Sequence, residues 1–572
     1  MKRQLGKILG DRRIMGALLI VIQAVLVIWG LDTLSQRVPW IYWMCYVLSA
    51  VIIIWIVRKY DNPSYKIPWI ILILVFPLFG GIFYLAWGNT PFNRARAQHK
   101  FVFPKPDFSS GLSHPAGSRM VAAMPRHTRR SNYIASLTGM PVWGETAVRY
   151  FPLGENQFTA MCEELKKAER FIFMEYFIIE QGEMWQPILD ILTEKVRAGV
   201  EVRVMYDDAG CMTKLPSGYE TYLRSLGIRT VRFNRFIPTL NTYLNYRDHR
   251  KITVIDGNVG YMGGANIADE YINRRSPFGH WKDTGIELRG AGVANMTELF
   301  LEMWEYATRV AVSDHLQYRP TISRPGDGYV QSFGDSPLDD INVGETVYMQ
   351  IINNARDYVY ITTPYLVLDN EMITALTTAA QSGVDVRIIT PGIPDKKMTY
   401  QLPRSYFQPL LQAGVRIFSY TPGFLHSKTW LCDDRIAAVG TVNLDYRSLY
   451  LHFECSTLLY GCRALADIRA DMIELERVPQ QLFRHAALGC TAHHGPAVLT
   501  AAGFSCPRLA QGPTFSRHRT FDRPKRRPYA AKRTFVRGAG DRVYLPGHRS
   551  GRRHGIFLQK RDGPADPKAV SR

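Results

Sequence analysis

The first part of the chain is dominated by three apolar stretches, each close to the length that crosses a bilayer. They are Ile14–Leu31, Trp40–Val57 and Ile67–Trp87. About 20 apolar residues cross the hydrocarbon core of a membrane. A cleaved signal peptide is disfavoured, because no small-x-small cleavage site follows the first stretch and further apolar stretches do. The pattern therefore predicts a membrane region over residues 1–90.

The basic residues around these stretches indicate their orientation. They cluster before the first stretch, between the second and third, and after the third, whereas the loop between the first two holds only Arg37. The positive-inside rule places that loop outside and the other three regions inside. Two spans and a third segment that dips into or lies on the membrane satisfy this rule, and Pro77, Gly80 and Gly81 interrupt the third segment. We expect a multi-pass membrane protein with the rest of the chain in the cytoplasm.

After a Pro/Gly/Arg-rich linker at residues 91–130, apolar runs alternate with amphipathic segments. Residues 171–179 form an apolar run that predicts a buried strand, and residues 184–198 have helical periodicity. Two more strands are predicted at 199–206 and 227–233. Strand–helix–strand alternation is typical of a parallel or mixed sheet that is covered by helices.

The same order of elements returns later in the chain. The predicted elements are a strand at 358–366, a helix at 370–382, and strands at 383–390 and 414–420. The clearest echo is between AGVEVRV, which begins at Ala198, and SGVDVRI, which begins at Ser382. The sequence thus predicts an α/β protein made of two similar mixed-sheet halves, residues 131–320 and 321–478.

Charge separates the last residues from the rest. The chain carries a net charge of +20, and residues 479–572 contribute +15 of it, with 19 Lys/Arg and 4 Asp/Glu. Hydrophobic periodicity stops at the same point. One interpretation is a disordered basic arm that binds anionic lipid or nucleic acid. The other is a coding accident, a frameshift near residues 460–480 followed by read-through.

A repeated polar motif carries the candidate chemistry. His-x-Lys-x4-Asp occurs twice, and each copy is followed by Gly-x-x-Asn at the same distance. The members are His249, Lys251, Asp256 and Asn266 in the first half, and His426, Lys428, Asp433 and Asn443 in the second. One such motif arises easily by chance, whereas two copies with matched spacing do not.

These residue types suit phosphodiester exchange without a metal. The reaction needs a nucleophile, a proton donor for the leaving alcohol, and positive charge on the phosphoryl oxygens. Two imidazoles can serve as the nucleophile and as the proton donor near neutral pH. Two ammonium groups and two amides can hold the phosphoryl oxygens. A carboxylate beside phosphate would repel it, so we interpret Asp256 and Asp433 as architectural members of the catalytic motifs. No cofactor or metal is expected, and the eight cysteines contain no CxxC pair.

The two motifs resemble those of the phospholipase D superfamily. The apolar region, with NPSYKIPWIILILVFPLFGGIFYLAWGN from Asn62, is similar to that of bacterial cardiolipin synthases, and the resemblance covers about residues 10–460. It implies two halves of α/β/α sandwich form that share one site. It also implies a ping-pong reaction through a phosphatidyl-histidine, in which two phosphatidylglycerols yield cardiolipin and glycerol. By this analogy His249 is the nucleophile and His426 the acid and base, although the residues alone do not separate the two roles.

Each imidazole needs a partner on its second nitrogen. Glu454 is the candidate in the second half, and Asp283 is its counterpart in the first, because both open an apolar segment after the motif. The resemblance supports this role. The family's Thr-Pro-Tyr-x-x-Pro segment ends here in Leu368, so the choice of acceptor is open.

Three functions remain to be distinguished. The first is cardiolipin synthesis, with phosphatidylglycerol and anionic membrane lipid as partners and no obligatory protein partner. The second is a phospholipase D-type hydrolase or a phosphodiesterase acting on nucleic acid. The apolar stretches argue against a nucleic-acid substrate, since a nuclease does not need them. The third is a membrane protein inactivated by an aberrant C-terminus.

Overall fold

The computed structural model describes residues 39–59, 63–88, 115–236, 245–339, 341–395 and 401–477, with a few positions between 21 and 33. The predicted stretch Ile14–Leu31 lies largely outside these residues. The basic tail at 479–572 lies entirely outside them, so both interpretations of the tail stay hypotheses.

The second and third apolar stretches form helices. They are α3 (Pro39–Arg58), α4 (Pro63–Val75), α5 (Pro77–Phe83) and the π-helical turn η1 (Tyr84–Gly88). The predicted break at Pro77 is confirmed, because α4 ends just before this residue, which cannot donate a backbone hydrogen bond. The expected interruption at Gly80 and Gly81 is wrong, because both lie inside α5. A Cβ atom on Gly80 would meet the backbone of Ile73 at 2.6 Å, so this glycine permits close helix packing. The described helices include none long and apolar enough to cross a membrane, and the predicted spans stay predictions.

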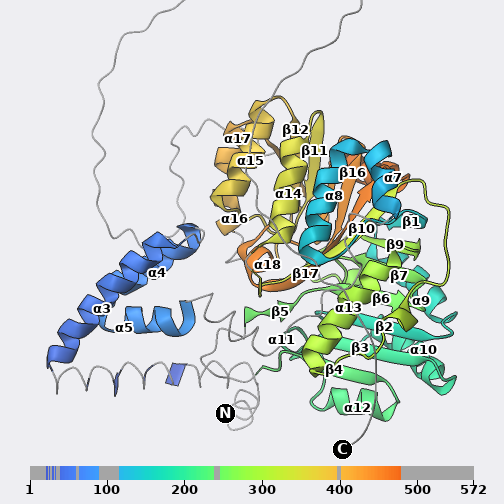
Figure 1. The fold of residues 1–572 in the computed structure, drawn as a ribbon, viewed down its shortest axis with the longest axis horizontal. Helices are drawn as coiled ribbons and strands as arrows, with labels where there is room; N and C mark the ends of the chain where they lie inside the picture. The colour runs from blue at the N-terminus through green and yellow to red at the C-terminus, as the bar shows by residue number, and fades with distance from the viewer. Residues whose placement is uncertain are drawn as a thin grey trace, which may run out of the picture. The chain divides into compact units, whose positions relative to one another are not determined.

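Two sheets with the same strand order form the body of the protein (Figure 1). The first sheet consists of β1 (Thr146–Phe151), β9 (Gly285–Gly290), β7 (Val259–Gly263), β6 (Lys251–Ile255), β2 (Phe171–Tyr176), β3 (Glu201–Asp207) and β4 (Arg229–Phe233). The second consists of β10 (Tyr329–Asp335), β17 (His452–Tyr460), β16 (Ile436–Gly440), β15 (Thr429–Cys432), β11 (Tyr358–Thr362), β12 (Asp385–Pro391) and β13 (Arg416–Tyr420). In each sheet the last three strands are parallel and the others antiparallel. The prediction of two mixed-sheet halves is confirmed.

Alternating side chains along each strand explain the layers. On β2, Ile172 and Met174 pack under the helices that cover the first sheet, whereas Phe171 and Phe173 face the other side. The covering helices of the first sheet are α9 (Gly154–Leu165), α10 (Trp185–Arg197) and α12 (Tyr219–Ser225). Those of the second are α14 (Val343–Asn354), α15 (Asn370–Gln381) and α17 (Phe407–Gln412).

A central core joins the two halves. Helices α13 (Val293–Thr308) and α19 (Ala464–Arg477) place apolar side chains among residues from the inner faces of both sheets. Phe300 of α13 stacks on Phe173 with ring centroids 4.6 Å apart, and Ile468 of α19 is fully buried. The two halves therefore share one continuous apolar core.

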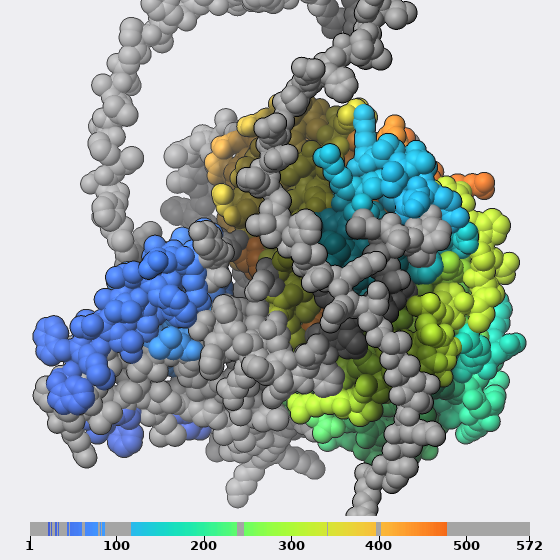
Figure 2. Space-filling view, viewed as in Figure 1, coloured from blue at the N-terminus to red at the C-terminus, as the bar shows by residue number. Residues whose placement is uncertain are grey.

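The region expected to be a linker is partly helical. Helices α7 (Pro115–Ala123) and α8 (Pro125–Thr138) precede the first half in the chain but pack on the second, where Met120 and Ile134 enter its core. Arg130 also donates a hydrogen bond to the carbonyl of Gln350 at 2.7 Å. The cyan surface of these helices adjoins the yellow and orange surface of the second half (Figure 2). The many Pro, Gly and Arg residues hid this helical pattern in the sequence.

Two short strands cross from one half to the other. β5 (Arg247–Asp248) runs parallel to the start of β17, and β14 (Gly423–Leu425) runs parallel to β8 (His280–Lys282). Each of these pairs joins a segment of one half to a strand of the other. The residues that follow β5 and β14 are the two motif histidines.

Candidate active site

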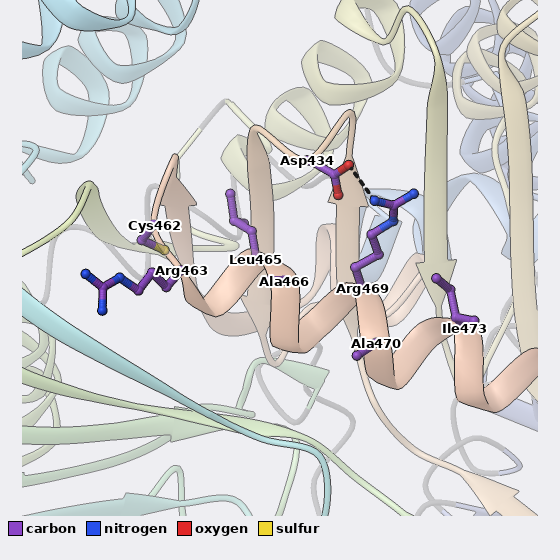
Figure 3. A pocket seen from close by; sticks show the side chains of 8 residues that line it. All are labelled: Asp434, Cys462, Arg463, Leu465, Ala466, Arg469, Ala470 and Ile473. Atoms are coloured by element: carbon purple, nitrogen blue, oxygen red, sulfur yellow. Dashed lines mark ion pairs between the residues drawn. The ribbon is translucent and has the colours of Figure 1, made fainter.

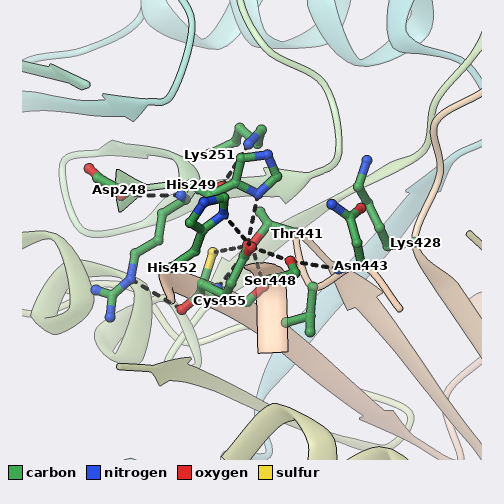
Figure 4. A network of polar contacts seen from close by, with 12 residues as sticks. Asp248, His249, Lys251, Lys428, Thr441, Asn443, Ser448, His452 and Cys455 are labelled. Atoms are coloured by element: carbon green, nitrogen blue, oxygen red, sulfur yellow. Dashed lines mark hydrogen bonds and ion pairs between the residues drawn. The ribbon is translucent and has the colours of Figure 1, made fainter. Parts of the chain in front are cut away.

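His249 is held at the boundary between the halves by its backbone and by its ring. It directly follows β5, and its N–H donates to the carbonyl of Phe453 on β17 at 2.9 Å. Its Nδ1 lies 2.9 Å from Oε2 of Glu454, and the residue is 7% exposed (Figure 4). The strand pairing of β5 with β17 thus places this imidazole against a carboxylate that is distant in the sequence.

His426 repeats the arrangement on the other side. It directly follows β14, and its N–H donates to the carbonyl of Lys282 on β8 at 2.7 Å. Its Nδ1 lies 2.7 Å from Oδ2 of Asp283, and the residue is also 7% exposed. The two imidazoles are therefore held in the same way, each by a backbone hydrogen bond and by a carboxylate on Nδ1.

The histidine–carboxylate pairs cross between the halves. The sequence placed Glu454 as the candidate of the second half and Asp283 as that of the first, but each contacts the histidine of the opposite half. This corrects the assignment by half, which the sequence could not foresee because it depends on the pairing of very short strands. Neither half alone contains a complete pair.

Glu454 is fixed by several donors besides the imidazole. Oε2 also accepts from Oγ1 of Thr441 at 2.5 Å, and Oε1 accepts from the hydroxyl of Ser448. On the other side, Oδ1 of Asp283 accepts from the N–H of Thr284 at 2.9 Å. An ionised carboxylate only accepts hydrogen bonds, so each imidazole donates its Nδ1–H and keeps a lone pair on Nε2.

Each motif lysine contacts its own histidine. Nζ of Lys251 donates to the carbonyl of His249 at 2.6 Å, and Nζ of Lys428 donates to the carbonyl of His426. Nζ of Lys428 also lies 2.7 Å from Nδ1 of His426. An ammonium group and an Nδ1–H are both donors, so this approach is not a hydrogen bond while His426 donates to Asp283.

Burial shifts the pKa values of these groups. It lowers the pKa of His249 to about 3, against the opposing charge of Glu454. It lowers the pKa of His426 to about 4, with Lys428 acting in the same direction and Asp283 against it. Burial also lowers the pKa of Lys251 to about 8 and that of Lys428 to about 7. Both imidazoles are therefore neutral near pH 7 before substrate binds.

The carboxylate of Glu454 remains ionised. Burial alone would raise its pKa, but the hydrogen bond that it accepts from Nδ1–H of His249 holds the pKa below its ordinary range. A neutral imidazole beside an ionised carboxylate is the state in which Nε2 is nucleophilic.

The side-chain amides of the two motif asparagines differ in their hydrogen bonds. Oδ1 of Asn266 accepts from the N–H of Ile178 at 3.0 Å, and its Nδ2 donates to the hydroxyl of Tyr271 at 2.7 Å. Asn443 is 5% exposed, and its Oδ1 has no hydrogen-bond partner among the described residues. The amide of Asn443 therefore has hydrogen-bonding capacity left, while that of Asn266 is engaged with the protein.

Asp256 and Asp433 hold neighbouring backbone in the two sheets. The carboxylate of Asp256 accepts from the backbone N–H groups of residues 169, 170 and 171, at 2.7 to 2.9 Å. That of Asp433 accepts from the N–H groups of residues 356, 357 and 358, each at 2.9 Å. Both residues have positive φ angles, 54° and 53°. These contacts support the architectural interpretation of both residues.

One group of described residues has the composition of a metal site. It consists of His249, Glu454 and His452, the first residue of β17. His452 belongs to neither of the two sequence motifs.

A separate hollow lies on α19, away from these residues (Figure 3). Its volume is about 460 Å³, and an ion pair of Arg469 with Asp434 at 3.0 Å crosses its edge. It is lined by Asp434, Cys462, Arg463, Leu465, Ala466, Arg469, Ala470 and Ile473. None of the motif residues lines this hollow, so it is not the candidate active site.

Comparison with known proteins identifies the family. A family model described as "Cardiolipin synthase, PLD-like domain" matches residues 161–300 and 348–475, one segment in each half. A second, "Phospholipase_D-nuclease N-terminal", matches residues 47–89. A cardiolipin synthase of Geobacillus kaustophilus is 36% identical over 76% of this chain and 89% of its own length. The chain belongs to the bacterial cardiolipin synthases of the phospholipase D superfamily. It is therefore an enzyme, and its activity is phosphatidyl transfer between phospholipids.

Further known proteins are similar to this chain. A cardiolipin synthase of Geobacillus thermodenitrificans is 35% identical over 82% of this chain and 93% of its own length. An uncharacterized protein of Streptococcus mutans is 43% identical over 76% of this chain and 94% of its own length. Among solved structures, a phosphatidylserine synthase of Haemophilus influenzae has a TM-score of 0.49 and 16% identity, over 62% of this chain and 91% of that one.

Three polar residues of the site were missed by sequence reasoning. Thr441 and Ser448 fix Glu454, and His452 lies beside it. The only signal for the first two was their position around the second Gly-x-x-Asn. His452 had a better signal, because it stands two residues before a predicted imidazole partner and so lies on the same face of the strand.

Proposed function

We propose that this protein condenses two phosphatidylglycerol molecules to cardiolipin and glycerol through a phosphatidyl-histidine intermediate. The observation that carries the proposal is the crossed pair of histidine–carboxylate contacts. It supplies two equivalent imidazoles, each with its Nδ1–H engaged by a carboxylate. Two such groups are what a double displacement at phosphorus requires, one as nucleophile and one as acid and base.

In the first step, Nε2 of His249 attacks the phosphorus of a bound phosphatidylglycerol. The P–N bond forms as the P–O bond to the headgroup glycerol breaks, and the protonated imidazole of His426 gives its proton to the departing oxygen. His426 is neutral in the empty site, so it takes up this proton together with the anionic phosphodiester, whose charge favours the imidazolium. Asp283 stabilises that cation from the other ring nitrogen.

In the second step, a headgroup hydroxyl of another phosphatidylglycerol attacks the same phosphorus. The neutral His426 accepts the hydroxyl proton, the P–N bond breaks, and Nε2 of His249 regains its lone pair. The proton given up in the first step is recovered in the second, so the cycle is balanced. The opposite assignment of the two histidines obeys the same balance, and the family resemblance favours His249 as the nucleophile.

The lysines and asparagines hold the phosphoryl oxygens in this proposal. Nζ of Lys251 and Nζ of Lys428 each donate to the backbone carbonyl of a motif histidine, and an anionic oxygen readily outcompetes a carbonyl as the partner of an ammonium group. Asn443 is the better candidate of the two amides to donate its Nδ2–H to a phosphoryl oxygen, since the side chain of Asn266 is engaged by Ile178 and Tyr271.

We also propose that the enzyme resides in the bacterial cell membrane, with its catalytic halves in the cytoplasm. The support is the series of apolar stretches, the basic residues around them, and the match of residues 47–89 to an N-terminal family model. A membrane-resident enzyme meets both lipid substrates in the plane of the bilayer.

The test is a product analysis with purified full-length protein and phosphatidylglycerol vesicles. The proposal predicts cardiolipin and glycerol in equal amounts, and loss of both in His249→Ala and His426→Ala. Phosphatidic acid as the sole lipid product would instead identify a hydrolase. Full activity in either histidine variant would refute the two-histidine mechanism.

A further inference from the structure

A third histidine lies against the pair formed by His249 and Glu454. His452 is 8% exposed, and its ring centroid is 5.4 Å from that of His249. Its Nδ1 lies 3.5 Å from Oε1 of Glu454, and neither ring nitrogen has a hydrogen-bond partner among the described residues (Figure 4). Apart from this one long contact with Glu454, the ring nitrogens have lost the hydrogen bonds that they would make to water, which is unfavourable for a buried imidazole.

The other half shows that this histidine is not part of the shared machinery. Trp281 stands two residues before Asp283, as His452 stands two residues before Glu454. The ring of Trp281 lies 5.4 Å from that of His426, the same separation as between His452 and His249. An indole fills this position as well as an imidazole but offers no lone pair to a metal. The two equivalent positions therefore share a packing role, and only His452 adds ligand chemistry.

We propose that His249, His452 and Glu454 bind a single zinc-like divalent transition-metal ion, and that the bound ion switches the active site off. One ligand atom from each residue lies within 4.8 Å of the other two. Two imidazoles and a carboxylate are a donor set that zinc prefers, with water as the fourth ligand. Zinc ligand atoms stand about 3.3 Å apart in a tetrahedral site, so side-chain movements of about 1–1.5 Å bring the three atoms onto one ion.

The inhibitory effect, unlike the binding, rests on the proposed function. The ion takes the position of the proton between Nδ1 of His249 and Glu454, which are 2.9 Å apart. The displaced proton moves to Nε2 of the neutral imidazole, so no proton is lost from the ring. Nε2 then carries a hydrogen and no lone pair, and it cannot attack phosphorus. The ion sits behind the ring relative to the substrate, so added phosphatidylglycerol does not displace it.

The binding test uses zinc alone and the purified full-length protein in detergent after treatment with a chelator. Calorimetry is expected to show one ion per wild-type chain. The variants His452→Asn and His452→Trp, the second of which copies the other half, are expected to lose at least about 100-fold in affinity, more than the 10–100-fold that follows loss of an outer-shell partner.

His315→Gln is the matched control. His315 also lies between two carboxylates, with Nδ1 2.7 Å from Glu298 and Nε2 3.0 Å from Glu305. Its two nitrogens face different acids, so they do not converge on one ion, and this variant is expected to bind zinc as the wild type does. An unchanged affinity in both His452 variants, or no saturable zinc binding by the wild type, would overturn the inference.

A second measurement separates the inhibition from the function. Zinc is expected to abolish cardiolipin formation by the wild type, and a chelator is expected to restore it. Both His452 variants are expected to keep their activity in zinc, when each is compared with its own rate without zinc. If a His452 variant does not fold, the absorption spectrum of the cobalt-loaded wild type replaces it, and a spectrum without nitrogen ligation contradicts the site. Zinc binding by a protein without cardiolipin synthesis would sink the proposed function and leave the site. An active enzyme that binds no zinc would sink the site alone.

Discussion

Glu454→Gln tests the crossed pair with the smallest change of shape. Glu454 is fully buried, and it accepts hydrogen bonds from His249, Thr441 and Ser448. A glutamine with its oxygen at the Oε1 position still accepts from Ser448, but its amide group then donates at the Oε2 position, where the carboxylate accepted from His249 and Thr441. Nδ1 of His249 then accepts a hydrogen bond from this amide, so the ring hydrogen moves to Nε2. The nucleophilic lone pair is then lost while the packing is preserved.

The expected loss of enzymatic activity in Glu454→Gln is large compared with the expected change in the free energy of unfolding. In a serine-protease triad, replacing the carboxylate by an amide selects the wrong tautomer and lowers turnover by about 10⁴. We expect a fall of about 10³–10⁴ in cardiolipin formation, which corresponds to about 4–5.5 kcal/mol in the activation free energy. The free energy of unfolding is expected to fall by only about 1–3 kcal/mol, the range for one altered buried hydrogen-bonding group.

The assay is the initial rate of cardiolipin formation from phosphatidylglycerol vesicles, with thermal unfolding measured on the same samples. Glu175→Gln is the control. Glu175 is also fully buried, and burial together with the nearby charge of Asp248 raises its pKa well above the ordinary range, so an amide preserves its neutral state. Activity close to that of the wild type is expected for this control. A Glu454→Gln enzyme that keeps more than about a tenth of wild-type turnover, a loss under about 1.4 kcal/mol, would refute the tautomer argument.

The same geometry leads to expectations for pH dependence and for stability. Burial lowers the pKa of Lys428 to about 7, so the free enzyme loses this positive charge as the pH rises through 7. We therefore expect kcat/KM for phosphatidylglycerol, which reports the free enzyme, to fall above pH 7. The value of kcat reports the enzyme with phosphate bound to the lysine, and it should stay level. A pH profile of both constants checks this, and a level kcat/KM up to pH 9 would contradict it. Asp433→Ala should lower the free energy of unfolding by about 2–3 kcal/mol, because three backbone donors lose a charged acceptor, and Asp433→Asn should lower it less because asparagine tolerates the positive φ. Thermal unfolding measures both, and equal melting temperatures would contradict it. Burial lowers the pKa values of His249 and His426, so the unfolded chain binds protons below about pH 6.5 that the folded chain does not, and stability should fall on acidification by up to about 1.4 kcal/mol per pH unit for each histidine. Urea unfolding at pH 6.5 and 5 should therefore show a smaller difference in His426→Phe than in the wild type.

Much of the fold was predictable because it rests on local patterns. The predicted strand at 171–179 and the helix at 184–198 correspond to β2 (Phe171–Tyr176) and α10 (Trp185–Arg197). The predicted strand at 358–366 ends earlier, at Thr362, two residues before Pro364, which cannot donate to a ladder. The duplication was visible in the two echoing segments, and the matched strand orders of the two sheets confirm it.

The crossed histidine–carboxylate pairs could not be predicted from the sequence, for a physical reason. It depends on β5 and β14, which are two and three residues long and pair with strands of the opposite half. Such segments have no periodicity that can be recognised, and their pairing is decided by the packing of the two halves. The helical character of residues 115–138 was hidden in a different way, by a composition that is typical of linkers.

The central claim is that both histidines serve one site with a single covalent intermediate. The most direct measurement is a rapid quench of purified enzyme with phosphatidylglycerol labelled in the phosphatidyl group, followed by mass analysis of the histidine-containing peptides. We expect an adduct that rises to one per chain on His249 and decays as cardiolipin forms. Adducts on both His249 and His426 of the same chain, or cardiolipin formed at the full rate without any adduct, would contradict the claim.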